Sequence, residues 1–200
     1  MMDVPVDGAR VLVMFSGGLD SAALLKLMLT ETQNKIWVHH ISMRTKPHRW
    51  EAEDPAAFKC LRYFSNYYRP FTFSESVIDI EKDVSGWRDI ELIAFLGSLY
   101  ARENKAGFVV SGQKKADPTN SSLPDEWLAR RKFESDMLKL FYPSACWVYP
   151  IVEWSKQKIA DYLEPELRQL TWSCRIPVKK NDTWIPCGHC FACVAKKEME

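Results

Sequence analysis

The chain has 200 residues, of which 46% are hydrophobic and 26% are charged, so it is long enough to bury a core and has the composition of an ordinary globular protein. Its 27 basic and 26 acidic side chains give a formal net charge of +1, which excludes the overall positive field that attracts a protein to nucleic acid. No stretch reaches the roughly 18 apolar residues of a membrane helix, and the first residues lack the basic start and apolar run of a secretion signal. We therefore expect a cytoplasmic protein with no membrane partner and no direct nucleic-acid binding.

Short apolar runs alternate with helical patterns through most of the chain. The expected strands cover residues 10–15, 35–41, 71–80, 108–111 and 147–149. The expected helices cover residues 22–30, 54–67, 89–104, 125–141 and 154–163. Asp54 and Pro55 are predicted to begin the second helix, because an acidic cap followed by proline is typical of a helix start. The alternation predicts a doubly wound parallel α/β domain over residues 1–170.

A glycine-rich turn joins the first strand to the first helix. It reads Ser16-Gly17-Gly18-Leu19-Asp20-Ser21. Two glycines let the backbone approach an anion closely, and the following helix directs its free N–H groups and positive dipole end at that anion. Asp20 repels phosphate unless a cation lies between them, which indicates Mg²⁺. No Gly-Lys-Ser/Thr string follows, so this is not a Walker loop.

This string resembles the pyrophosphate loop, or PP-loop, of the ATP-pyrophosphatase superfamily, whose fold is that of the adenine nucleotide alpha-hydrolases. The resemblance implies that ATP adenylates an oxygen of the substrate and that a nitrogen or sulfur nucleophile then displaces AMP. It also implies that the loop holds the leaving pyrophosphate, with Mg²⁺ bridging.

Four cysteines gather in the segment 171–200, which we expect to pack on the main domain. Cys174, Cys187, Cys190 and Cys193 have the spacing of a closed four-thiolate zinc site, which is structural rather than catalytic. Gly188 lets the chain wrap around the metal. An iron–sulfur cluster, a disulfide pair and a ligand role for His189 are the alternatives.

Two cysteines stand alone in the sequence. Cys60 lies on a predicted helix and Cys146 lies beside Trp147. Buried structural thiols are the simplest interpretation, and a persulfide carrier is the alternative.

The glycine loop and the cysteine tail together resemble the 7-cyano-7-deazaguanine synthase family of the queuosine pathway. The tail carries the similarity in Thr171-Trp172-Ser173-Cys174 and in residues 186–193 (PCGHCFAC), and the stretch 150–159 leads into it. His48 and Glu51 resemble the family's His-x-x-Glu, and residues 110–112 (VSG) resemble the strand before its substrate loop. The chain departs from the family at residues 86–89 (GWRD) and 123–127 (LPDEW), where the family has Gly-Arg-Asn and Tyr-Pro-Asp-Cys-Arg strings.

The loop chemistry, the resemblance and the position of residues at the carboxyl ends of the expected strands together give a set of expected site residues. Those placed in catalysis are Asp20, Ser21, Arg88 and His48. Those placed at ATP are Ser16, Gly17, Gly18, Leu19, Asp20, Ser21, His40, Ser42, Met43, Arg44 and Gly112. Those placed at the substrate are Lys114, Asp117, Pro124 and Asp125, with Lys115 as a further cation. His39 is expected to be a packed strand residue.

The reaction implied is the ATP-dependent conversion of a 7-carboxy-7-deazaguanine to its amide and then its nitrile, with ammonia as nucleophile and a homodimer as the assembly. The changed substrate loop leaves open a ligase that joins deazaguanine to another amine. A sulfurtransferase that uses Cys60 or Cys146, and a nucleotide-binding module without catalysis, are the remaining alternatives.

Overall fold

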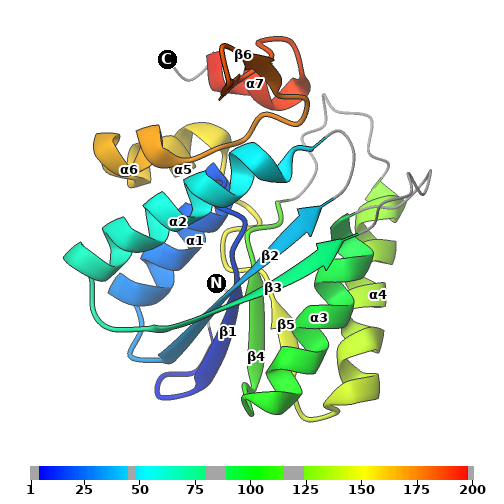
Figure 1. Cartoon of the computed structure of the whole chain (residues 1–200). Coiled ribbons are helices and arrows are strands. Elements are labelled where there is room, and N and C mark those ends of the chain that lie inside the picture. The colour runs from blue at the N-terminus through cyan, green and yellow to red at the C-terminus, as the bar shows by residue number, and fades with distance from the viewer. Residues whose placement is uncertain (1–4, 45–47, 80–88, 115–123, 198–200) are drawn as a thin grey trace.

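The computed structural model describes residues 5–44, 48–79, 89–114 and 124–197 (Figure 1). Its strands are β1 (Arg10–Met14), β2 (Lys35–Arg44), β3 (Thr72–Asp79), β4 (Phe108–Ser111), β5 (Cys146–Val148), β6 (Val178–Lys180) and β7 (Thr183–Ile185). Its helices are α1 (Leu19–Thr30), α2 (Trp50–Tyr67), α3 (Asp89–Glu103), α4 (Pro124–Phe141), α5 (Lys156–Tyr162), α6 (Pro165–Leu170) and α7 (Phe191–Lys197).

The first five strands form one parallel sheet in the order β3-β2-β1-β4-β5. The chain first builds outward from β1 to β3 and then returns to the other side of β1 with β4. This reversal lies between β1 and β4, and in open α/β sheets ligands bind at the carboxyl ends of the strands at such a point. The fold is therefore the doubly wound α/β architecture that the sequence predicts.

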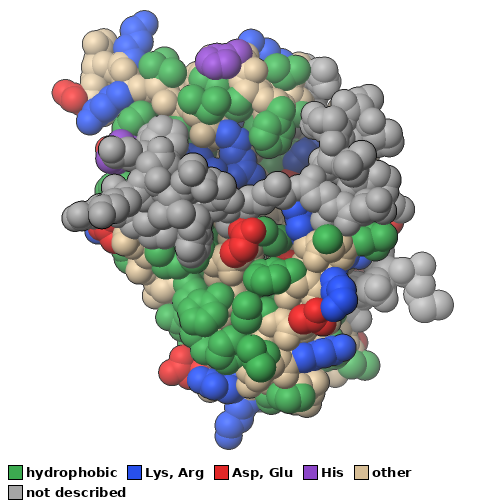
Figure 2. All heavy atoms as spheres, turned by 90° about the vertical axis from the view of Figure 1, so that its right-hand side faces the viewer, with side chains coloured by type: hydrophobic (Ala, Val, Ile, Leu, Met, Phe, Trp, Pro, Cys, Tyr) green, Lys and Arg blue, Asp and Glu red, His purple; other side chains and the backbone are tan. Residues whose placement is uncertain are grey.

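Helices cover both faces of this sheet (Figure 1). On one face, α1, α2, α5 and α6 enclose a core in which Leu24, Leu25 and Phe64 are completely buried. On the other face, α3 and α4 enclose a smaller core around Leu12 and Leu138. Figure 2 looks onto this second side, where hydrophobic side chains gather on the surface; the exposed apolar residues of α3 and α4 are Phe95, Leu128, Phe133 and Leu140.

The start of α2 differs from the prediction. The helix begins at Trp50 rather than at Asp54, and Pro55 lies inside it. The ion pair between Arg49 and Glu53, at 2.9 Å, supports this added turn. The carboxylate of Asp54 is therefore not a cap: it points to β2, where His40 and Ser42 contact it.

The tail holds more regular structure than its sequence pattern predicts. The strands β6 and β7 form an antiparallel hairpin in which Val178 pairs with Ile185, and α7 follows. The short helix α6 was also not predicted. The hairpin turn uses Asn181 and Asp182, both with positive φ, which is the conformation that such turns require. In the described part of the chain, no helix is long and apolar enough to cross a bilayer.

Candidate functional site

The turn between β1 and α1 is tightly enclosed by the rest of the fold. Gly17 has a φ of +76°, and a Cβ atom placed on it would lie 2.6 Å from Cα of Ala57 in α2. Any side chain at residue 17 would therefore collide with the backbone of α2. On the other side, a Cβ atom on Gly112 would lie 2.9 Å from the carbonyl carbon of Asp20. Gly17 is required because the backbone of α2 packs against the loop, and Gly112, which follows β4, is required because the loop packs against it.

The start of α1 offers donors to an anion. The first backbone N–H groups of any helix have no intrahelical acceptor, and here the N-cap residue Gly18 supplies no side-chain acceptor either. The hydroxyl groups of Ser16 and Ser21 lie 3.1 Å apart and brace the turn, since Ser21 Oγ also donates to Gly18 O at 3.0 Å. Leu19 is buried, so it faces the core and can contribute to a ligand only through its backbone. This arrangement suits phosphate groups.

A lysine that is distant in the sequence also lies at the start of α1. Lys156, the first residue of α5, donates to both carboxylate oxygens of Asp20, at 2.7 and 2.5 Å. Both side chains are partly exposed. An anion site that is framed by helix amides, an ammonium group and a carboxylate can hold a polyphosphate and a divalent cation together. Sequence reasoning missed Lys156, because it lies 136 positions away from Asp20.

The residues expected to contact adenosine at the end of β2 divide into two groups. His40 and Ser42 are almost completely buried, and both contact Asp54: His40 Nε2 lies 3.1 Å from Oδ1, and Ser42 Oγ donates to Oδ2 at 2.5 Å. Burial acts to lower the pKa of His40, but the bonds to Asp54 and Phe15 raise it above its ordinary value. These two side chains therefore fix β2 to α2 and the loop.

The other two members of that group reach the surface of the site. Met43 is half-buried and Arg44 is exposed, with its guanidinium group 5.0 Å from the ring centre of Trp50. Met43 and Arg44 are therefore accessible at the end of β2, whereas His40 and Ser42 are bonded to Asp54 inside the fold.

His48 and Glu51 lie at the start of α2. His48 has a φ of +61°, and its Nδ1 lies 3.8 Å from Glu51 Oε1. Glu51 also accepts a hydrogen bond from the indole of Trp184 in β7, at 3.1 Å. His48 is exposed, so it can reach a ligand, and Glu51 connects it to the tail.

An ion-pair group joins the starts of α2 and α3 to the tail. Asp89 Oδ2 lies 2.7 Å from Arg49 and 2.9 Å from Arg175. Although burial acts to raise it, the pKa of Asp89 is lowered because both guanidinium groups stabilise the carboxylate. These contacts hold the tail against the carboxyl edge of the sheet.

The four cysteines of the tail come together. The Sγ atoms of Cys174, Cys187, Cys190 and Cys193 all lie within 4.8 Å of one another and could hold a metal ion. Cys187 and Cys193 are 3.9 Å apart, and Cys174 and Cys190 are 4.0 Å apart. A tetrahedral zinc ion with Zn–S bonds of about 2.3 Å separates its sulfur ligands by about 3.8 Å, so the thiols fit one such ion. His189 Nδ1 lies 3.0 Å from the carbonyl of Cys187, and the group of four contains cysteines alone.

The segment that leads to this cluster contacts the glycine loop directly. The backbone N–H of Trp172 donates to Gly17 O at 3.0 Å, and its indole donates to Cys174 O at 3.1 Å. A Cβ atom on Gly18 would lie 3.4 Å from Trp172 O. Trp172 therefore connects the cysteine cluster to the loop, because it is bonded to both Gly17 and Cys174.

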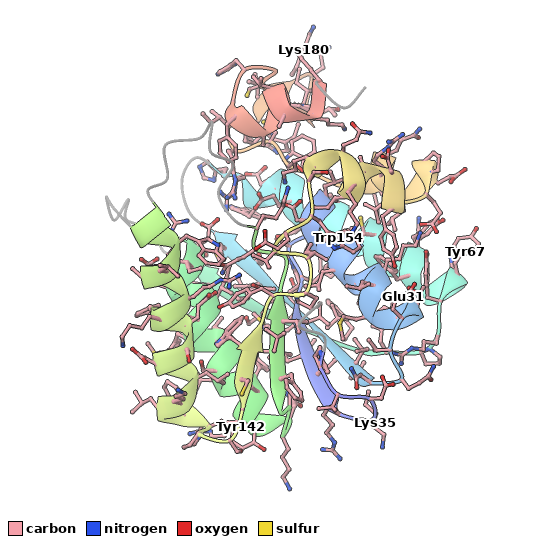
Figure 3. All side chains as sticks on the ribbon, turned by 180° about the vertical axis from the view of Figure 1, so that it is seen from behind. Glu31, Lys35, Tyr67, Tyr142, Trp154 and Lys180 are labelled. Atoms are coloured by element: carbon pink, nitrogen blue, oxygen red, sulfur yellow. The ribbon has the colours of Figure 1, made fainter. Side chains whose placement is uncertain are left out.

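The two lone thiols lie away from this region. Cys60 is completely buried in α2, and burial raises its pKa to about 12. Cys146 is the first residue of β5. Ala145, the residue before it, donates a backbone hydrogen bond to the carbonyl oxygen of Tyr142. Figure 3 places Tyr142 at the end of the molecule opposite Lys180 of the tail, so Cys146 lies at the amino ends of the strands, away from the loop.

Several expected site residues fall beyond the described structure. Arg88, Lys115 and Asp117 lie outside the described residues. Pro124 and Asp125 form the first turn of α4, and their side chains also lie outside the described structure. Lys114 is half-buried directly after Gly112 and Gln113, at the carboxyl end of β4.

Comparison with known proteins agrees with this architecture. The phosphoadenosine phosphosulfate reductase domain family matches residues 10–168, which run from the first residue of β1 into α6. No curated protein matches the sequence of the chain.

Among solved structures, the chain is similar to the U34-tRNA thiolase NcsA from Methanococcus maripaludis with its [4Fe-4S] cluster. The TM-score is 0.55 at 15% identity, over 92% of this chain and 64% of the thiolase chain. At this identity the likeness shows a shared fold, and the chain spans under two thirds of that protein. A universal stress protein family member from Burkholderia pseudomallei aligns over 72% of this chain and 96% of its own, with 13% identity and a TM-score of 0.38, which is too low to support an argument.

Proposed function

The chain belongs to the phosphoadenosine phosphosulfate reductase domain family within the PP-loop superfamily, and we propose that it uses ATP to adenylate an oxygen atom of an acceptor, releasing pyrophosphate. One observation carries this proposal: the uncapped start of α1, the carboxylate of Asp20 and the ammonium group of Lys156 converge on one anion site. Such a site suits the two phosphates that leave together when the α-phosphorus is attacked.

The chain's own residues supply positioning and charge. The acceptor oxygen attacks the α-phosphorus, and the bond to the bridging oxygen of pyrophosphate breaks. The amides at the start of α1 and Lys156 stabilise the negative charge that develops on the leaving group. Asp20 is the residue that would hold Mg²⁺, which supplies further charge neutralisation when bound. A nucleophile then attacks the carbon that bears the adenylated oxygen, the bond between this carbon and the oxygen breaks, and AMP leaves with the oxygen.

For the acceptor, we propose a 7-carboxy-7-deazaguanine, with ammonia as the nucleophile. The sequence resemblance of the tail to 7-cyano-7-deazaguanine synthases supports this choice. The thiol spacing also supports it, because four cysteines around one ion complete the coordination shell and make a structural zinc site. In this reaction Cys174, Cys187, Cys190 and Cys193 would hold Zn²⁺ and would take no part in the chemistry.

Sulfur transfer is the second candidate. The family name and the thiolase neighbour with its iron–sulfur cluster favour it. The buried Cys60 and the remote Cys146 are poorly placed to carry sulfur. A thiolation reaction would therefore have to use the cysteine cluster, with iron in place of zinc. The metal bound to the cluster distinguishes the two candidates.

The test combines metal content with turnover. Protein purified without oxygen is analysed for zinc and iron, and it then receives ATP, Mg²⁺, 7-carboxy-7-deazaguanine and ammonia. One zinc per chain and acceptor-dependent release of AMP, absent from Asp20→Ala, are expected. Iron with visible absorption, together with AMP release that requires a sulfide donor and RNA, would replace the main candidate with the second. ATP binding without AMP release under either condition would contradict the proposed function.

A further inference from the structure

A buried carboxylate that is bonded to Gln113, the residue after Gly112, has no role in the reaction as described above. Glu134 of α4 is completely buried. Its two oxygens accept hydrogen bonds from Gln113 Nε2 and from the hydroxyl group of Tyr149. Burial raises the pKa of Glu134 to about 7, although these two bonds and the charges of Arg131 and Arg130 act to lower it. A buried acid of this kind is costly and needs its partners.

The carboxylate connects three elements at the carboxyl edge of the sheet. Gln113 follows β4, Tyr149 follows β5, and Glu134 comes from α4, which packs against β5. The guanidinium group of Arg131 lies between two rings, 3.4 Å from the ring centre of Trp127 and 4.0 Å from that of Tyr149. This packing fixes the Tyr149 ring, and so it also restrains the carboxylate.

Gln113 is the member of this group that is closest to the nucleotide loop. It directly follows Gly112, whose Cα faces the backbone of Asp20 and Ser21. Gln113 is half-buried, whereas Glu134 and Tyr149 are buried. Of these three side chains, Gln113 is therefore the one that is partly exposed, and it directly follows the glycine that packs on the loop.

The carboxylate also decides which way the Gln113 amide faces. Gln113 Nε2 donates to one oxygen of Glu134 and the Tyr149 hydroxyl group donates to the other, so the NH₂ group of Gln113 faces Glu134 and its carbonyl oxygen Oε1 faces away. Among the described residues, no donor is bonded to Gln113 Oε1. The site thus presents a fixed acceptor atom next to the loop.

We infer that Gln113 is a specificity-determining residue whose amide oxygen accepts a hydrogen bond from an N–H group of the acceptor substrate. Glu134 is the positioning residue that holds the Gln113 amide in this orientation. The ligand class is a heterocycle with amide or amidine N–H donors near the oxygen that is adenylated. This inference rests on the proposed function and assigns the recognition of the acceptor within it.

The test measures binding of 7-carboxy-7-deazaguanine to the full chain in the presence of a non-hydrolysable ATP analogue. Gln113→Leu removes the amide at similar size, and Glu134→Gln lets the Gln113 amide rotate because its new partner can both donate and accept. We expect each change to raise the Kd of the acceptor roughly ten-fold, the effect of one lost hydrogen bond, and to leave the Kd of the ATP analogue within about two-fold. An analogue of the acceptor without the exocyclic amino group should bind the wild type and Gln113→Leu more equally.

Gln157→Leu is the matched control. Its amide also donates to a carboxylate, Asp161 at 2.8 Å, but on the exposed face of α5. This variant should leave both dissociation constants unchanged. Because Gln113 is half-buried, its leucine variant remains informative even if Glu134→Gln unfolds.

The outcomes separate this inference from the proposed function. Acceptor binding that is unchanged in Gln113→Leu, or a loss of acceptor and nucleotide binding by the same factor, would overturn the inference alone. Absence of acceptor-dependent AMP release by the wild type, measured in parallel, would overturn the proposed function. If the wild type binds no acceptor at all, both are wrong.

Discussion

Lys156 Nζ lies within hydrogen-bond distance of both carboxylate oxygens of Asp20, at 2.7 and 2.5 Å. The two residues are 136 positions apart in the sequence, and their contact lies at the start of α1. This contact gives the sharpest test of how the site handles charge.

Substitution of Lys156 should weaken the handling of pyrophosphate. Lys156→Met retains the length of the side chain and removes its charge. A hydrogen bond to a charged group contributes about 1.5–3 kcal/mol, so we expect a ten- to hundred-fold fall in kcat/KM for ATP, measured by pyrophosphate release. Lys158→Met is the control, because Lys158 lies on the same helix with its ammonium group 4.3 Å from the Trp154 ring. Equal effects of the two changes would contradict a specific role for Lys156.

A side chain at residue 112 should disturb the nucleotide loop. Gly112→Ala places a Cβ atom 2.9 Å from the carbonyl carbon of Asp20, where backbone must move. Such overpacking costs about 1–3 kcal/mol, and we expect this loss in urea unfolding together with weaker ATP binding. The control is Gly107→Ala, since a Cβ atom on Gly107 would meet nothing within 4 Å. Full stability of Gly112→Ala would show that the loop adjusts without cost.

Metal removal should act on the loop as well as on the tail. The Cys174 segment is bonded to Gly17 through Trp172, so a tail released by chelation no longer supports the loop. We expect a strong chelator, or Cys187→Ser, to lower the unfolding temperature and to raise the Kd for ATP, read by calorimetry. Cys146→Ser, at the other end of the sheet, should leave metal content and ATP binding unchanged. ATP affinity that survives complete loss of the metal would show that the tail and the loop are independent.

The lone thiols should be dispensable for turnover. Cys60→Ala and Cys146→Ser are expected to retain AMP release within about two-fold, because one thiol is buried with a pKa of about 12 and the other is remote. The measurement is AMP release under identical ATP and acceptor. Loss of turnover in either variant, with the fold intact by circular dichroism, would restore the persulfide mechanism.

The stability of the fold should fall in mild acid because of His39. Its ring is completely buried between the hydroxyl groups of Ser74 and Ser76, at 2.8 and 3.0 Å, and against Tyr100. Burial first, and then the neighbouring His40, lower the pKa of His39 from 6.5 to about 4. The folded state therefore binds fewer protons than the unfolded chain between these two values. The contribution of the neutral His39 ring to the free energy of unfolding is complete above pH 6.5 and is lost as the pH falls toward 4.

The size of this effect follows from the shift. The difference of about 2.5 pH units corresponds to about 3 kcal/mol. We expect the free energy of unfolding of the wild type to fall by roughly this much more than that of His39→Gln between pH 7 and pH 4, in urea titrations. Parallel pH profiles for the two proteins would show that His39 is protonated in the fold without cost.

The strands and the long helices follow from local pattern. The five sheet strands were predicted to within a few residues, because four of them contain short apolar runs and β3 alternates polar and apolar residues along part of its length. The error at Asp54 has a physical cause: an Asp-Pro pair is a typical helix start, but Arg49–Glu53 pairing extends α2 by a turn, and His40 and Ser42 claim the carboxylate. The β6–β7 hairpin was missed because its strands are three residues long and mostly exposed.

The candidate site was predicted unevenly for a similar reason. The residues of the glycine loop are contiguous and the four cysteines are closely spaced, so residue type and spacing were enough to predict both as candidate sites. His40 and Ser42 were expected at adenosine because they end a strand, yet their side chains face Asp54, and strand position alone does not tell which side chains reach a ligand. The domain boundary at residue 170 and the assignments to Arg88 and Asp117 stay predictions.

The sequence by itself determined the alternation of strands and helices, a glycine-rich turn after the first strand, and a set of four thiols that could hold a metal ion, because each depends on residues that are near one another along the chain. Only the tertiary structure decided that Lys156 neutralises Asp20, that Trp172 connects the cysteines to the loop, and that Glu134 orients Gln113. The bonded pairs Gln113 and Glu134, Asp20 and Lys156, and Gly17 and Trp172 are 21, 136 and 155 positions apart in the sequence. No local pattern encodes such pairs, since they arise when parallel strands bring their carboxyl ends to one edge of the sheet.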